Sequence, residues 1–263
     1  MPIDLITLLS PKNLILFVVV FTRLGGMMVT APLISTYPIP TQIKMWFMAM
    51  VAFIMFPIVL AKTGFQMPTS IPELSIILLK EFMIGYIVGF VSNLVFIGVE
   101  ISADLMSMQV GLTAAQALNP ATGDTSPILS QAYTILAGMI FIGMGGYQWM
   151  FSAVFKSFQV LPPGYNVIIG GTITHNIIFL TSQIFEIGLG IALPIFSVLI
   201  ITDVLLGVVA KMMPKMNIFM VALPVKIYLG IVLFIMLISP MCTQLQALLE
   251  KYLTNIAIVF GGG

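Results

Sequence analysis

Residues 74–101 read LSIILLKEFMIGYIVGFVSNLVFIGVEI, and this stretch decides the fold class. Its charged residues are Lys80, Glu81 and Glu100, and almost everything else is apolar. About 20 apolar residues in helical form cross the hydrocarbon core of a bilayer. A helix also satisfies its own backbone hydrogen bonds, which lipid cannot do for it. The stretch therefore predicts a membrane-length α-helix.

The whole chain shares this apolar character. Its 263 residues contain only 10 Lys and Arg and 9 Asp and Glu, 60% are hydrophobic, and the mean hydropathy is +1.15. A soluble domain of this size needs more charged surface. The net charge of +1, without any basic run, excludes a nucleic-acid-binding protein. We therefore expect lipid or other apolar protein around much of the chain.

Five more apolar segments, together with 74–101, predict about six helices in one compact all-α unit of kinked helical hairpins. These five segments are 14–31, 45–61, 128–155, 177–210 and 218–239. The segment 177–210 is too long for one straight crossing, so we expect Pro194 to kink or divide it. We expect Gly143, Gly145 and Gly146 to break or bend 128–155. A seventh stretch, 245–260, looks amphipathic.

The lysines do not set an orientation in the membrane. With six crossings, four lysines fall on one side and three on the other, which decides nothing under the positive-inside rule. The first group is Lys12, Lys62, Lys156 and Lys251, and the second is Lys44, Lys211 and Lys215. This balance indicates that a simple crossing topology is the wrong description.

The longest polar connection is 108–126, MQVGLTAAQALNPATGDTS, which still contains several apolar residues. Loops of this length tend to be lids, plugs or re-entrant segments lining a cavity. An exposed connector is the alternative. Met106 and Met108 stand beside this loop, and methionine can seal an irregular gap.

A few residues inside the apolar segments predict helix-to-helix contacts. Gly85 and Gly89 form a GxxxG pattern, which lets two helices approach closely. Arg23 and Glu81 lie in different segments, and we interpret them as an inter-helix ion pair because isolated buried charge is costly. Three isolated charges, Glu186, Asp203 and Lys226, act as polar contacts between helices or as parts of a proton relay.

The sequence offers little chemistry for catalysis. Glu100 and Asp104 share a helix face, but no third carboxylate lies near them to complete a metal site. His175 is the only histidine and has no Cys or His partner in a zinc-binding pattern. The motifs of hydrolases, metalloproteases and P-loop enzymes are absent. We therefore predict no catalytic, cofactor-binding or metal-binding residues, and a protein that is not an enzyme.

The order and spacing of several elements resemble the FliR family of flagellar export-gate proteins and its counterpart in injectisome secretion systems. The elements are Arg23 with Ala31-Pro32 and Pro40, Glu81 with Gly85 and Gly89, Gln109-Val110-Gly111-Leu112 with Asn119-Pro120 and Gly123, Ser157-Phe158 with Pro162 and Gly164, and Pro214 with Asn217-Ile218-Phe219, Pro224 and Lys226. Gly146-Tyr147 departs from the Gly-His expected there, so Tyr147 receives no role.

This resemblance implies a core subunit of the type III protein export gate in the bacterial inner membrane and flagellar basal body. One such subunit would join five FliP-like and four FliQ-like subunits in a closed channel. Residues 1–170 would be FliP-like, and residues 171–263 would form a FliQ-like hairpin. FlhB-like and FlhA-like proteins, unfolded export substrates and membrane lipid would be its other partners.

The resemblance also implies a plug loop at about 106–124. Its residues would be Met106, Met108, Gln109, Val110, Gly111, Leu112, Leu118, Asn119, Pro120 and Gly123. A small secondary transporter or ion channel remains the alternative, although no inverted repeat is visible. A membrane-embedded enzyme is a third class, and the convergent polar groups that it needs are scarce.

Overall fold

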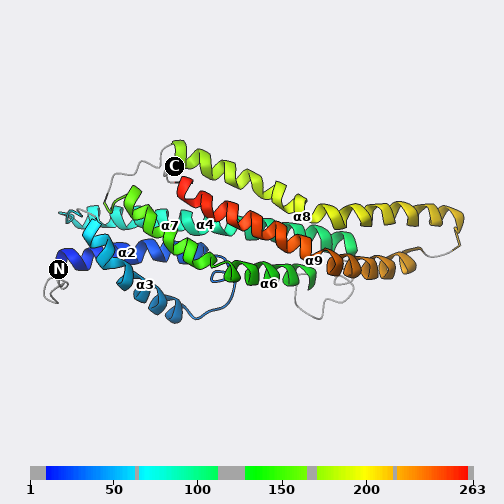
Figure 1. Cartoon of the computed structure of the whole chain (residues 1–263), viewed down its shortest axis with the longest axis horizontal. Coiled ribbons are helices and arrows are strands. Elements are labelled where there is room, and N and C mark those ends of the chain that lie inside the picture. The colour runs from blue at the N-terminus through cyan, green and yellow to red at the C-terminus, as the bar shows by residue number, and fades with distance from the viewer. Residues whose placement is uncertain (1–9, 63–64, 112–127, 165–170, 216–217, 260–263) are drawn as a thin grey trace. The chain divides into compact units, whose positions relative to one another are not determined.

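The computed structural model describes residues 10–62, 65–111, 128–164, 171–215 and 218–259, and every regular element in these ranges is an α-helix (Figure 1). This confirms the all-α prediction. The helices are α2 (Pro11–Thr30), α3 (Thr41–Lys62), α4 (Ile71–Val110), α6 (Ile128–Gly143), α7 (Gly146–Val160), α8 (Gly171–Met212) and α9 (Ile218–Val259).

The chain divides into two compact units that alternate along the sequence. Unit 1 contains Met1–Leu94, Gly145–Thr181 and Glu250–Gly263, and unit 2 contains Val95–Met144 and Ser182–Leu249. The long helices α4, α8 and α9 therefore contribute residues to both units. The resemblance implies a different division, a single cut of the sequence at residue 170 into a FliP-like and a FliQ-like part, and this division stays a prediction.

Unit 1 has its core among α2, α3, α7 and the first part of α4. The inner face of α3 carries a buried stripe at helical spacing, formed by Ala52, Met55, Phe56 and Val59. Phe56 packs edge-on against Phe17 of α2, with the ring centroids 6.2 Å apart. Apolar residues spaced three and four apart on one face thus explain why α3 packs on this side only.

Unit 2 is built from the end of α4, α6 and most of α8 and α9. Two aromatic pairs join its helices, since Phe96 packs against Phe141 at 5.4 Å and Tyr133 against Phe234 at 4.9 Å between centroids. A Cβ on Gly98 of α4 would crowd the side chain of Ile187 on α8. The core of this unit is therefore also built by helix-to-helix contact.

Several helices run further than the apolar segments predicted. Pro194 does not divide its segment, because α8 runs through it for 42 residues. The stretch predicted as a separate amphipathic piece at 245–260 continues α9, which is also 42 residues long and contains Pro224 and Pro240. The loop predicted at 108–126 begins later than expected, because α4 continues to Val110. The predicted break in 128–155 is confirmed at Met144 and Gly145, where Gly145 has a φ of +73°.

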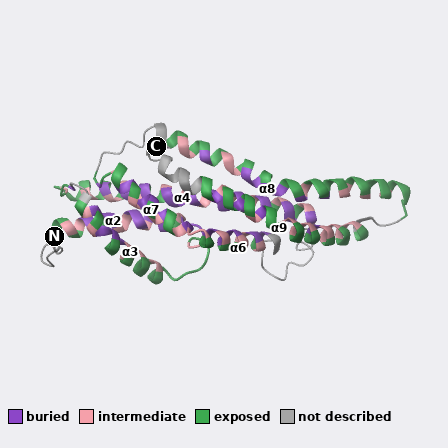
Figure 2. Ribbon diagram, in the orientation of Figure 1, coloured by how far each residue is buried: buried purple, intermediate pink, exposed green. Residues whose placement is uncertain are grey.

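Five of the described helices are long and apolar enough to span a membrane, and the number rises to six if α6 and α7 form one broken span. The prediction of about six is consistent with this range. In α3 and α8 only 22% of the apolar window is buried, and in α9 only 6%. Figure 2 shows the corresponding long exposed stretches. Unlike the helices of a soluble bundle, these expose apolar residues to their surroundings.

Candidate functional site

Arg23 of α2 and Glu81 of α4 meet in the interior of unit 1. The Arg23 Nε donates a hydrogen bond to Glu81 Oε2 at 2.6 Å, and the two side chains are 0% and 3% exposed. The structure thus brings together the two charges that the sequence pairs. A buried charge without such a partner would be severely destabilising.

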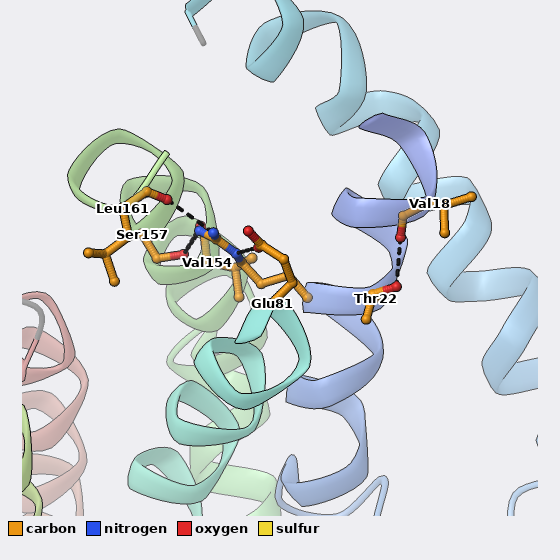
Figure 3. A network of polar contacts seen from close by, with 7 residues as sticks. Val18, Thr22, Glu81, Val154, Ser157 and Leu161 are labelled. Carbon is orange, nitrogen blue, oxygen red and sulfur yellow. Dashed lines mark hydrogen bonds and ion pairs between the residues drawn. The ribbon is translucent and has the colours of Figure 1, made fainter. Parts of the chain in front are cut away.

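Helix α7 and Leu161, which directly follows it, supply the remaining partners of this guanidinium, as the converging dashed lines in Figure 3 show. Arg23 Nη1 donates to Ser157 Oγ at 2.9 Å, and Nη2 donates to the carbonyl oxygen of Leu161 at 3.0 Å. The guanidinium carbon also lies 3.8 Å from the centroid of the Phe158 ring. We call Arg23, Glu81, Ser157 and the Leu161 carbonyl the arginine centre. It joins α2, α4 and the C-terminal end of α7.

The α2–α4 contact beside the arginine centre is a crossing of glycines. A Cβ on Gly85 would overlap the backbone carbonyl of Arg23, and one on Gly89 would overlap that of Met27. Gly26 does the same from the α2 side, because its Cβ would overlap the carbonyl of Phe82. The two helix backbones are therefore in direct contact, which the GxxxG pattern on α4 predicts and which needs Gly26 as well.

The end of α4, where the predicted plug begins, lies in unit 2. Met106 is fully buried, with its sulfur 3.4 Å from Tyr133 Oη, which lies closer, at 2.8 Å, to the Met241 sulfur of α9, whereas Met108 is exposed. Met106 and Met108 therefore do not share one environment within the chain. Val110 is buried, and Gly111 has a φ of +88°, a conformation that favours glycine.

Gln109 links this end of α4 to α8 and α9. Its Nε2 donates to Asp203 Oδ2 at 2.8 Å, and Lys226 forms an ion pair with Asp203 Oδ1. The side chains of Asp203 and Lys226 are 40% and 18% exposed, so this ion pair is partly exposed, whereas the arginine centre is buried. The sequence treated Asp203 and Lys226 as isolated charges, and the structure pairs them.

The other candidate residues have separate positions. Asp104 accepts a hydrogen bond from Ser130 at 2.6 Å, and Glu100 is exposed. Tyr147, which departs from the family pattern, donates to the carbonyl of Pro32 at 2.9 Å. The rest of the predicted plug lies outside the described residues, namely Leu112, Leu118, Asn119, Pro120 and Gly123. Within the described ranges, no three His, Cys, Asp or Glu residues gather in a way that could hold a metal ion.

The fold and the two ion pairs, Arg23 with Glu81 and Asp203 with Lys226, define a membrane-associated helical protein whose paired charges join helices. Residues 14–252 match the family described as "Bacterial export proteins, family 1", and the chain belongs to this family.

Full-length relatives agree with the family match. The chain is 28% identical to the flagellar biosynthetic protein FliR of Escherichia coli K12, over 89% of both chains. It is 26% identical to FliR of Caulobacter vibrioides, covering 84% of this chain and 87% of the relative, and 24% identical to FliR of Bacillus subtilis, covering 85% and 86%. The resemblance to the FliR family is confirmed.

Proposed function

We propose that this chain is the FliR-type subunit of the flagellar type III protein export apparatus in the bacterial inner membrane. The observation that carries the proposal is the match to bacterial export proteins over residues 14–252. The chain also matches relatives named flagellar biosynthetic protein FliR over most of their length. The five apolar helices of membrane-spanning length support the membrane location. Its role there is structural, as part of a secretion channel, and not catalytic.

At finer detail, the chain assembles with five FliP-like and four FliQ-like subunits and works beside FlhB-like and FlhA-like proteins. The exposed surface of α8 and α9 supports an assembly of this kind. Most of the apolar window of each helix is exposed, and both helices also expose charged residues such as Glu186 and Glu250. A surface that mixes large apolar area with charge suits protein partners better than lipid tails.

The proposed plug, 106–124, restrains small ions while the channel is idle. Support comes from its first residues, because the end of α4 is held at two points. Met106 is buried against Tyr133, and the Gln109 amide donates to Asp203. Gly111 then turns the chain out of the helix with a positive φ. These contacts fix the position of the C-terminal end of α4, from which the proposed plug continues.

Two measurements test the function. Removal of the gene should abolish secretion of flagellar subunits into the medium, and the intact gene should restore it. Purification in mild detergent should yield a large hetero-oligomer that contains the FliP-like and FliQ-like proteins. A stable monomer or a small homo-oligomer would instead indicate a transporter or channel.

The plug has its own test. Deleting residues 112–118 should leave the complex assembled but raise the small-ion conductance of membranes that contain it. A matched control replaces 112–118 with a Gly-Ser segment of equal length, which separates the loss of apolar residues from the loss of length. An assembled deletion complex with unchanged conductance would show that the segment is a passive connector.

A further inference from the structure

The turn between α2 and α3, residues 31–40, has an unusual backbone conformation at Leu33. Among the described residues, Leu33 is the only one other than glycine with a positive φ, at +66°. The amide of Ile34 donates to the carbonyl oxygen of Pro32 at 2.8 Å, which closes a γ-turn centred on Leu33. A γ-turn with this sign of φ is rare and strained, above all for a large side chain. Surrounding contacts have to hold such a conformation in place.

Two side chains from outside the turn bond to its carbonyl groups. Tyr147 Oη donates to the carbonyl oxygen of Pro32 at 2.9 Å, and Lys44 Nζ donates to that of Ile34 at 2.5 Å. Pro32 and Ile34 are the two neighbours of Leu33, so a bond from another helix fixes the chain on each side of the strained residue. Tyr147 lies in the first turn of α7 and Lys44 in the first turn of α3. We call these two hydrogen bonds the turn clamp.

The break between α6 and α7 positions Tyr147. Helix α6 ends at Gly143, α7 begins at Gly146, and Gly145 between them has a φ of +73°. Glycine adopts this conformation at no steric cost, whereas Leu33 does not. Tyr147 therefore follows a backbone position that its sequence favours and bonds to a turn whose sequence does not favour its conformation. We conclude that Tyr147 holds the turn and that the turn does not hold Tyr147.

The turn has few other contacts that could keep it strained. The strain of a non-glycine residue at positive φ is of the same order as the net contribution of one or two hydrogen bonds. Within the turn, Ser35 donates to the carbonyl of Ala31 and Tyr37 to that of Leu33. Residues 35–40 are all exposed, so the described chain provides little packing for them. Loss of either bond of the turn clamp should therefore let Leu33 relax.

We propose that Tyr147 is a positioning residue which, together with Lys44, holds the α2–α3 turn in the conformation that protein export requires. Strained backbone is found where function depends on the conformation that it fixes. The inference rests on the proposed function, and it gives a role to the residue that departs from the family pattern.

The first measurement is hydrogen exchange of peptides covering 31–40 in the complete complex. Tyr147→Phe removes the hydroxyl and keeps the ring, so the bonded amides of the turn should exchange about fivefold faster. Tyr228→Phe on α9, where the residue is 73% exposed, is the matched control and should leave the exchange unchanged. Lys44→Met removes the other bond of the turn clamp, and it replaces Tyr147→Phe if that variant reduces assembly.

The second measurement is secretion of flagellar subunits. Tyr147→Phe should lower secretion severalfold, and a second change, Leu33→Gly, should restore it, because glycine adopts a positive φ without strain. Leu33→Ala is the control for this rescue, since it also removes most of the side chain but keeps the strain. A purely structural role of the Tyr147 ring would not respond to the residue at position 33.

Several outcomes would overturn the proposal. Unchanged exchange in both Tyr147→Phe and Lys44→Met would mean that the turn holds its own conformation. Faster exchange with normal secretion would mean that export does not need the held turn. Rescue by neither Leu33→Gly nor Leu33→Ala, or by both alike, would mean that strain is not what Tyr147 balances. Restoration of secretion by the unaltered gene is scored separately, and its failure would contradict the proposed function and not the turn clamp.

Discussion

The two units handle buried charge in different ways. In unit 1, Arg23 is fully enclosed and each of its three nitrogens donates to a different acceptor. In unit 2, Asp203 bonds Gln109 and Lys226 but keeps 40% of its side chain exposed. Because the Arg23–Glu81 pair is buried, the loss of either partner would leave an unpaired buried charge and strongly destabilise the fold. The partly exposed Asp203–Lys226 pair contributes little free energy of stabilisation. Charge thus fixes the packing of unit 1 and leaves unit 2 adjustable.

The exposed surfaces of the two units differ less than their charges do. The apolar window of α3, in unit 1, is 22% buried, like that of α8, whereas that of α9, most of which belongs to unit 2, is only 6% buried. Side-chain hydrogen bonds at the arginine centre and direct backbone contact at the glycine crossing hold the helices of unit 1 together. The described residues of α8 and α9 leave most of their apolar windows exposed. Unit 1 is therefore the better place to look for large effects of single substitutions.

The largest effect is expected from breaking the arginine centre. Arg23→Met leaves Glu81 buried without a cation, and Glu81→Leu leaves Arg23 without its anion, so each should cost about 3–5 kcal/mol. The double variant should lose less than the sum, because neither charge remains. The denaturation midpoint of the purified complex in detergent measures this coupling. Purely additive losses would show that the two residues do not act as a pair.

A smaller loss is expected from the glycine crossing. Gly26→Ala places a Cβ against the carbonyl of Phe82, and overpacking of this kind costs roughly 1–3 kcal/mol. Gly25→Ala is the matched control, because the nearest atom to its Cβ is the Met48 sulfur at 4.0 Å. The control should be neutral or slightly stabilising, since alanine favours helix. Equal denaturation midpoints for the two variants would mean that α2 and α4 can separate enough to accept the extra methyl group without losing stability.

The features that depend on local composition could be predicted from the sequence. Long apolar segments imply helices, and isolated charges inside them imply partners, so the all-α fold and the pairing of Arg23 with Glu81 were within reach. The Leu161 carbonyl was not, because a backbone acceptor leaves no mark in a sequence. Gly26 stands next to Gly25, and only the direction of the crossing helix distinguishes the two.

The helix boundaries were missed for a different reason. Proline argues for an interruption, but a long helix absorbs it when the freed backbone groups find partners. The polar end of α4 stays helical, and there Ser102 and Ser107 donate to the carbonyls of Val99 and Ala103 at 2.6 and 2.7 Å. The pairing of Gln109 with Asp203 joins residues 94 positions apart, which no local pattern encodes.

The smallest effect is expected at Asp203, and it tests whether the Asp203–Lys226 pair stays partly exposed to solvent. Asp203→Asn removes the charge that attracts Lys226 but keeps an oxygen that can accept from Gln109. Because the pair is partly exposed, the loss should be about 1 kcal/mol or less. Asp203→Ala removes the acceptor too, so the last turn of α4 should exchange its amide hydrogens faster in this variant alone. Hydrogen exchange of peptides covering 105–111 in the intact complex measures the difference.

A loss for Asp203→Asn as large as that for Arg23→Met would mean that assembly encloses Asp203 as fully as unit 1 encloses Arg23. The distinction between a locked and an adjustable unit would then belong to the isolated chain and not to the working complex.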